Sequence, residues 1–163
     1  MKNIEIMAYQ PEHQPYFERF NRDWIEQYFW LEDIDRFVLQ HPQEAILDKG
    51  GAILMASFEG SIAGTVALRK VDEGIYEFTK MAVDPPFRRK GIAEALSYAA
   101  LQKAAELGAW KVILYSQTGL AAAIAMYRKI GFVEVPIEEG VYARSDIKME
   151  ILLKQDGNGK EPG

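Results

Sequence analysis

Three consecutive cations precede a glycine in the middle of the chain, at Arg88, Arg89, Lys90 and Gly91. Two prolines come before them, and an alanine-rich, helix-forming segment follows. Cations are unfavourable at a helix N-terminus, which already carries about half a positive elementary charge. The free N–H groups of a first helical turn bind phosphate, and Gly91 and the small Ala93 let a bulky diphosphate approach the backbone. The segment therefore favours a phosphate site, with a solvated basic turn as the alternative.

A second informative segment is the apolar, helix-forming stretch over residues 119–130, which ends at Gly131. Glycine is the usual residue for the left-handed cap that ends a helix. The residues that follow, 132–135, read Phe-Val-Glu-Val and predict a short strand. A helix, a glycine cap and a strand are therefore expected in direct succession.

The two segments together resemble the GNAT superfamily of N-acetyltransferases. The acetyl-CoA loop of that family reads Arg/Gln-x-x-Gly-x-Gly/Ala, and here Arg88, Gly91 and Ala93 match it. A later helix of the family often reads Asn-x-x-Ala-x-x-Leu-Tyr-x-x-x-Gly-Phe. The residues that fit this second pattern are Ala123, Met126, Tyr127, Gly131 and Phe132. Leu120 stands where the asparagine is expected. The resemblance covers about residues 3 to 153 and is most specific over 75–132.

This resemblance implies acetyl-CoA as the co-substrate and implies which residues hold it. The residues implied in cofactor binding are Met81, Val83, Arg88, Arg89, Lys90, Gly91, Ile92 and Ala93. The Met81 N–H is expected to polarise the thioester carbonyl, and the Val83 backbone to pair with the pantetheine amide as an added strand does. In relatives the missing asparagine helps hold the pantetheine arm or a water molecule. Gln117 or Thr118 could replace it.

An acidic residue in the middle of a predicted strand, Glu77, is the candidate general base. Only a deprotonated amine has the lone pair that attacks a thioester, so a base is useful near neutral pH. Alternation along the strand places Glu77 on the same face as Thr79 and Met81. Glu77 also lies eleven residues before Arg88, as the base does in the histone-acetylating branch of the family.

Tyr127, in the helix of the second motif, is the candidate general acid. A tyrosine at this place protonates the departing CoA thiolate in many members of the family, and the resemblance implies the same role here. Both candidates have a structural alternative. Tyr127 could be a half-buried aromatic residue at a helix end. Glu77 could be a glutamate at the solvent edge, paired with Lys80 or Arg69.

Size and composition limit the class of protein. The chain has 163 residues, 48% hydrophobic and 26% charged, which predicts one globular domain over 1–153 and a disordered tail over 154–163. No apolar run is long enough for a membrane span, the N-terminus lacks a signal peptide's apolar core, and the net charge of −5 argues against nucleic-acid binding. Because cysteine is absent, we expect no disulfide and no thiolate metal site, which agrees with a cytoplasmic location; no metal cofactor is expected. His13 and His41 are expected at the surface.

Hydrophobic periodicity predicts a mixed α/β fold. Strands are expected over 3–9, 52–58, 62–71, 75–83, 111–116, 132–135 and 141–153. Helices are expected over 11–39, with a break near Glu32 and Asp33, over 91–108 and over 119–130. The order β-α-α-β-β-β-α-β-α-β-β gives a central mixed sheet of six to seven strands flanked by helices. The family resemblance implies the same order.

Residues that contact an acceptor are less marked in the sequence. The aromatic stripe over 16–30 is expected to lie mainly in the core, but Phe29 and Trp30 fall off it and could line an acceptor pocket. Asp33 and Asp35 could attract a cationic acceptor or could simply be solvated.

Taken together, these features predict an acetyl-CoA-dependent N-acetyltransferase that acts by direct transfer to an amine of a small molecule or peptide. A homodimer is compatible with this prediction. Two alternatives stay open. One is a non-catalytic CoA-binding sensor or interaction module with the same fold. The other is an enzyme that uses a different acyl-CoA or acylates a hydroxyl.

Overall fold

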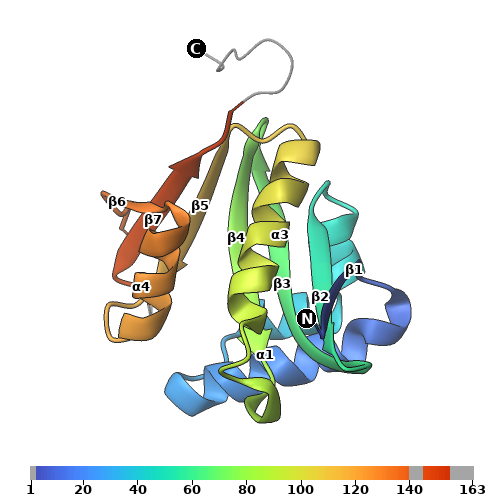
Figure 1. Cartoon of the computed structure of the whole chain (residues 1–163). Coiled ribbons are helices and arrows are strands. Elements are labelled where there is room, and N and C mark those ends of the chain that lie inside the picture. Colours follow the sequence, from blue (N-terminus) through green and yellow to red (C-terminus); the bar gives the residue numbers. More distant parts are fainter. Residues whose placement is uncertain (1–2, 140–144, 155–163) are drawn as a thin grey trace.

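A computed structural model describes residues 3–139 and 145–154, and its elements follow the predicted order (Figure 1). The strands are β1 (Ile4–Ala8), β2 (Ala52–Phe58), β3 (Ser61–Asp72), β4 (Ile75–Val83), β5 (Lys111–Ser116), β6 (Val133–Val135) and β7 (Ile147–Leu152). The α-helices are α1 (Gln14–Tyr28), α2 (Asp33–Gln40), α3 (Ile92–Glu106) and α4 (Ala121–Ile130). The periodicity therefore predicted each of these elements, to within a few residues except at the last strand.

The described strands form one seven-stranded sheet in the order β1-β2-β3-β4-β5-β7-β6. All neighbours are antiparallel except β4 and β5, which are parallel and pair only over Ile75–Glu77 and Lys111–Ile113. Beyond these positions the two strands separate toward the end of the sheet where α1 lies (Figure 1). This confirms the mixed sheet and leaves an opening between its two central parallel strands.

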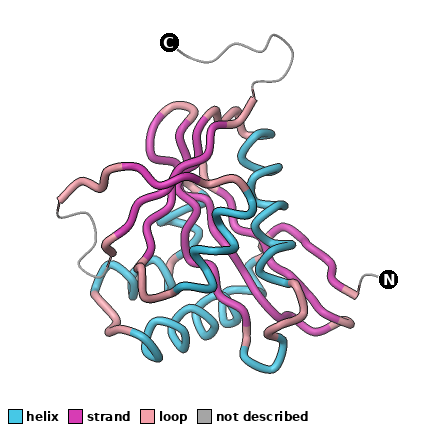
Figure 2. The backbone as a smooth tube through the Cα atoms, turned by 60° about the vertical axis from the view of Figure 1, so that its left-hand side comes forward, coloured by secondary structure: helices cyan, strands magenta, loops and turns pink. Residues whose placement is uncertain are grey.

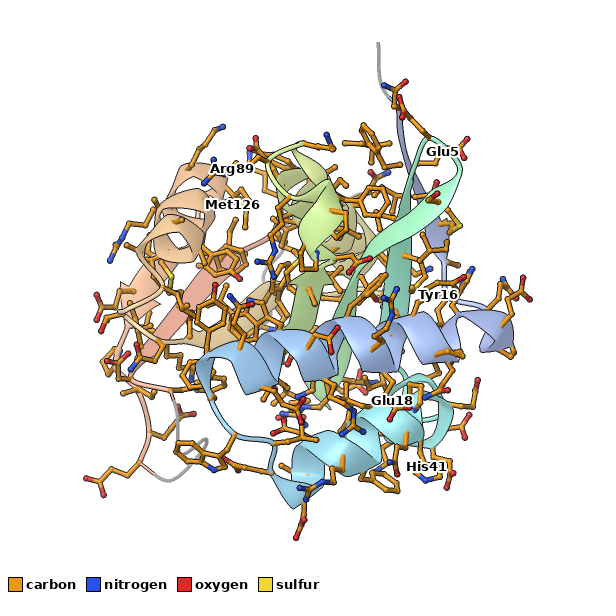
Figure 3. All side chains as sticks on the ribbon, turned by 90° about the horizontal axis from the view of Figure 1, so that it is seen from below. Glu5, Tyr16, Glu18, His41, Arg89 and Met126 are labelled. Carbon is orange, nitrogen blue, oxygen red and sulfur yellow. The ribbon has the colours of Figure 1, made fainter. Side chains whose placement is uncertain are left out.

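Helices cover both faces of the twisted sheet (Figure 2). Under α3 and α4 lies a large apolar cluster that includes Leu96, Phe78 and Phe132. On the other face a smaller cluster includes Phe17 of α1 and Leu39 of α2. Figure 3 shows α1 and α2 side by side on this second face, with Arg89 and Met126 on the opposite side of the sheet. Both helical layers therefore border the opening between β4 and β5.

A bulge in β4 changes the alternation that the sequence predicts. The pairing of β4 with β3 shifts beside Lys80, which has a left-handed φ of 55°. Met81 packs against the cluster under α3 and α4, and Phe78 belongs to that same cluster. Glu77, the neighbour of Phe78, therefore faces α1 and α2. The expectation that Glu77 and Met81 share a face is wrong, because the extra residue at the bulge reverses the order of the faces.

Two further expectations need correction. His13 is buried rather than at the surface, and its ring Nδ1 accepts a hydrogen bond from the Gln10 N–H at 2.9 Å. The prediction for His41 is confirmed, since its side chain is 48% exposed. The last strand begins later than predicted, at Ile147 instead of residue 141, and ends at Leu152; before it, the Asp146 carboxylate accepts hydrogen bonds from the Thr118 N–H and hydroxyl. Residues 140–144, and the predicted tail beyond Lys154, lie outside the described residues.

Candidate active site

A pocket of about 120 Å³ lies where β4 and β5 separate. Its walls come from α1 on one face of the sheet, from both parallel strands, and from α4 on the other face. Both candidate catalytic residues line it, Glu77 from β4 and Tyr127 from α4. The fold thus brings together two side chains that the sequence singled out independently.

Glu77 is almost completely buried, with 2% of its surface exposed. Its Oε1 accepts two hydrogen bonds from Arg69 on the neighbouring strand, from Nε at 3.0 Å and from Nη2 at 2.8 Å. The guanidinium compensates a charge whose burial is otherwise costly, and it fixes the carboxylate at the pocket wall. The predicted pairing with Arg69 is therefore present, but Glu77 does not lie at a solvent edge. Lys80, the other expected partner, binds Asp35 instead at 2.9 Å.

Tyr127 is also buried, and its ring makes edge-on contacts with two phenylalanines of the core. The ring centroids lie 5.7 Å from Phe78 and 5.9 Å from Phe132. Its hydroxyl makes no hydrogen bond with any residue that the structure describes. Burial raises the pKa of the Tyr127 phenol to about 12. The phenol therefore keeps its proton at neutral pH and has that proton available for a group in the pocket.

The segment before α3 has the geometry of an anion site. Gly91 caps the helix with a left-handed φ of 84°, and a Cβ placed on it meets no atom within 4 Å. Within the described chain, no backbone hydrogen bond is donated by the N–H groups of residues 89–94. Unpaired N–H groups at the start of a helix attract a phosphate. The open space at Gly91 is where a diphosphate would approach the backbone.

The side chains of this loop differ in what they can contribute. Arg88 is held by a hydrogen bond from its Nε to the Val83 carbonyl oxygen at 3.3 Å. Lys90 lies over the ring of Phe58, with Nζ 5.2 Å from the ring centroid. Ile92 is 1% exposed and belongs to the core, so only its backbone N–H could reach a ligand. The predicted roles of Arg88, Arg89, Lys90 and Ala93 stay predictions.

The model of the acetyltransferase (GNAT) family matches residues 7–132. The chain belongs to the GNAT family. Among curated proteins, N-acetylaspartate synthetase of Xenopus tropicalis is 30% identical over 110 residues, which covers 67% of this chain and 38% of that protein. This GNAT chain therefore spans well under two thirds of the length of that relative.

Solved GNAT structures have the same fold. An acetyltransferase from Staphylococcus aureus Mu50 superposes with a TM-score of 0.81 at 20% identity, covering 93% of this chain and 99% of that one. The PaiA N-acetyltransferase of Thermoplasma acidophilum, determined in complex with coenzyme A, superposes with a TM-score of 0.70 at 18% identity. That second match covers 92% of this chain and 99% of PaiA. At these identities the likeness establishes the fold alone.

The GNAT chain departs from the family pattern at Leu120, which lines the pocket at the start of α4. Of the two expected replacements, Thr118 is engaged elsewhere, because its hydroxyl donates to the Asp146 carboxylate at 2.8 Å. Gln117 does line the pocket, and its Oε1 accepts a hydrogen bond from the Gly119 N–H at 2.7 Å. Gln117 is therefore the better candidate for the missing asparagine.

The acceptor side of the pocket agrees with the sequence expectations only in part. Phe29 lines the pocket, and its ring centroid lies 5.8 Å from that of Trp24, which also lines it. Trp30 is 62% exposed and is not part of the lining, so its predicted role finds no support. Asp35 is neither solvated nor directed at an acceptor, because it is 1% exposed and binds Lys80. Asp33 is fully exposed and pairs with Arg36.

Sequence reasoning missed one buried polar residue of this pocket, Asn21 of α1. The signal was available, because Asn21 stands one helical turn after Phe17 and interrupts the apolar stripe of α1. Among the described residues there is no group of three or more potential metal ligands. In the same residues, no helix combines the length and apolar character that a membrane crossing requires.

The geometry of Gly91 leads to a first prediction. Replacing Gly91 with valine should weaken CoA binding at least about 10-fold, because the new side chain occupies the open space before the free N–H groups. Gly108→Val is the matched control, since Gly108 also has a left-handed φ (90°) and open space, but at the other end of α3. Isothermal titration calorimetry should show weaker binding for the first variant alone. Equal CoA affinity in both variants would remove this loop from the site.

Proposed function

We propose that this GNAT chain is an acetyl-CoA-dependent N-acetyltransferase that transfers the acetyl group directly to the amine of a small molecule or peptide. The observation that carries the proposal is that a buried carboxylate and a buried phenol line one pocket, from opposite faces of the sheet at the place where β4 and β5 separate. The candidate phosphate loop begins at the end of β4, so one ligand could occupy both sites.

Each of these groups has a task in acetyl transfer. Acetyl-CoA supplies the acetyl group as a thioester. Glu77 takes the proton of the acceptor ammonium, directly or through one water molecule, and so frees the lone pair that attacks the carbonyl carbon. We assign the Met81 N–H to bind the carbonyl oxygen as negative charge develops on it, because Met81 lines the same pocket. As the new C–N bond forms and the C–S bond breaks, the Tyr127 hydroxyl donates a hydrogen bond to the leaving sulfur. The amine loses its second proton to solvent, and the thiolate takes up one proton from solvent.

Family membership and the solved CoA complex of PaiA support CoA as the ligand of the loop. The name of the frog relative, N-acetylaspartate synthetase, supports an amine on a small molecule as one class of acceptor. The identity of the acceptor, a cytoplasmic location and a single domain over 1–153 stay predictions.

The proposal is tested by incubating the protein with acetyl-CoA and a panel of amines, including aromatic amines, amino acids and unblocked peptides. Mass spectrometry should detect an acetylated product that is absent with a Glu77→Gln, Tyr127→Phe double variant. Parallel reactions with propionyl-CoA and succinyl-CoA would show whether a different acyl group is preferred. Tight CoA binding without transfer to any member of the panel would contradict the proposal and favour the sensor.

A further inference from the structure

Asn21 of α1 has no part in the chemistry proposed above, although it lines the same pocket. The residue is 2% exposed, and its Nδ2 donates a hydrogen bond to the Phe17 carbonyl oxygen at 3.0 Å. A backbone carbonyl can only accept, so this bond requires the amide nitrogen at that position. The orientation of the side-chain amide is therefore fixed, with Oδ1 turned away from the Phe17 carbonyl.

The Oδ1 atom of Asn21 contacts the pocket. No described residue donates a hydrogen bond to it. In the described part of the chain, no side-chain oxygen or nitrogen is sealed from solvent without a partner. Since Asn21 is almost completely buried and yet lines the pocket, its amide oxygen contacts the pocket space itself. Such an oxygen is an acceptor that a bound ligand can use.

Asn21 and Glu77 line the same pocket from two elements that contact each other, α1 and β4. Helix α1 packs on the face of the sheet toward which Glu77 points, so the two oxygen acceptors enter the pocket from different walls. A neutral primary amine carries two N–H groups and one lone pair. We propose that Asn21 Oδ1 accepts one N–H and Glu77 the other, which leaves the lone pair directed at the thioester. This inference rests on the proposed function and assigns Asn21 as an acceptor-binding residue.

The arrangement also defines the substrate class. A secondary amine has one N–H fewer, and its extra alkyl group would lie against an oxygen that then stays unpaired. Sites that hydrogen-bond a substrate group discriminate strongly against analogues that lack it. The rings of Trp24 and Phe29 form the neighbouring wall and suit an aromatic or apolar body on the amine. The expected acceptor is therefore a primary amine on an apolar group, in preference to its N-methyl derivative.

The experiment compares phenethylamine with N-methylphenethylamine, or the best primary amine of the panel with its N-methyl derivative. The wild type should prefer the primary amine by about 10-fold or more in kcat/KM. Asn21→Leu should lower kcat/KM for the primary amine about 10–100-fold and reduce that preference to within about threefold. The KM for acetyl-CoA should not change, because Asn21 contacts the acceptor and not the CoA loop.

Two variants separate recognition from structure. Asn21→Asp keeps an oxygen toward the pocket but loses the donor to Phe17, so it should retain the preference for the primary amine. Gln14→Met removes another side-chain amide of α1. The Gln14 nitrogen donates to the Leu39 carbonyl oxygen at 2.9 Å, and the residue does not line the pocket, so kcat/KM for both amines should stay at the wild-type value.

The outcomes that would overturn the inference are specific. If Asn21→Leu keeps the wild-type preference, Asn21 does not bind the amine. If Asn21→Leu does not fold and Asn21→Asp loses the preference together with CoA affinity, the role of Asn21 is structural. If the wild type acetylates primary and N-methyl amines equally, the assignment of the substrate class fails while the proposed function survives. Failure to acetylate any amine removes the proposed function and this inference together.

Discussion

Glu77→Gln should lower the rate of acetyl transfer by about 10²–10⁴-fold at neutral pH, while CoA affinity stays within about twofold. Glutamine has the shape of glutamate and keeps an oxygen for the Arg69 guanidinium, which donates to Oε1 at 2.8 and 3.0 Å. It cannot take a proton from an ammonium group. The loss corresponds to about 3–5 kcal/mol of transition-state stabilisation. Steady-state kinetics with the best amine of the panel, beside CoA titration calorimetry, measures both quantities.

The pH dependence of this variant separates a base from a merely structural carboxylate. Raising the pH increases the fraction of amine that is already deprotonated in solution, so the reaction depends less on a general base. The ratio of wild-type to variant rates should therefore shrink steadily from about pH 7 to about pH 10. A ratio that stays constant over this range would show that Glu77 positions groups without accepting a proton. A wild-type rate at neutral pH would remove Glu77 from catalysis altogether.

Asp35→Asn is the matched control for Glu77→Gln. Asp35 is equally buried, at 1% exposed, and pairs with Lys80 as Glu77 pairs with Arg69. Both variants remove a buried negative charge that faces a cation, and Asp35→Asn should lower the melting temperature at least as much as Glu77→Gln, because Lys80 is more buried than Arg69 (11% against 44% exposed). Only Glu77→Gln should lose turnover, with Asp35→Asn within about threefold of the wild type. A parallel loss of activity in both variants would indicate a general weakening of this part of the fold.

Periodicity was sufficient for the order of elements because the helices carry one apolar stripe each and the strands are short apolar runs separated by glycine-containing turns. It could not predict the bulge in β4. The left-handed residue there is Lys80, and lysine has no preference for that conformation. Its pairing with Asp35, 45 positions away, also depends on how α2 packs on the sheet. The bulge placed Met81 on the face opposite to the expected one. The packing of α2 buried Asp35, which was expected to contact an acceptor or solvent.

The candidate site, like the fold, was predicted only in part from the sequence. Glu77 and Tyr127 are 50 positions apart in the sequence, and only the spacing of family motifs connected them. The pocket between them exists because β4 and β5 stop pairing after Glu77 and Ile113, which no local pattern encodes. Asn21 was visible as a polar break in an apolar stripe, but its use depends on the Phe17 carbonyl that orients its amide. Acceptor walls depend on such packing details, whereas the loop before α3 is a local motif.

Tyr127→Phe should lower turnover by about 10–10³-fold while CoA binding persists. The substitution keeps the ring and its edge-on contacts with Phe78 and Phe132, so the free energy of unfolding should change by less than about 1 kcal/mol. The substitution removes one hydroxyl that makes no hydrogen bond within the described chain, from a residue that lines the pocket. Tyr76→Phe is the control, because the Tyr76 hydroxyl bonds the Gly50 carbonyl oxygen and lies outside the pocket.

The raised pKa of Tyr127 determines how this effect should depend on pH. A phenol with a pKa of about 12 stays protonated up to about pH 10, where an ordinary tyrosine is already half ionised. The wild-type kcat should therefore show no decline from this group between about pH 7 and pH 10. A tyrosine whose pKa had been lowered would instead lose its donor within that range. A pH–rate profile with an alkaline decline in the wild type that is absent in Tyr127→Phe would contradict the buried, protonated phenol.

The raised pKa of Tyr127 also disfavours full transfer of its proton to the CoA thiolate. An ordinary thiol has a pKa of about 8.5, so full transfer from a phenol at about 12 to a thiolate is uphill by about 5 kcal/mol in water. Burial in the same pocket raises the pKa of the thiol as well and narrows this gap. Tyr127 should therefore act mainly as a hydrogen-bond donor that stabilises the leaving sulfur. A thioester with a more acidic thiol should then depend less on Tyr127, and an undiminished effect of Tyr127→Phe with such a substrate would contradict this role.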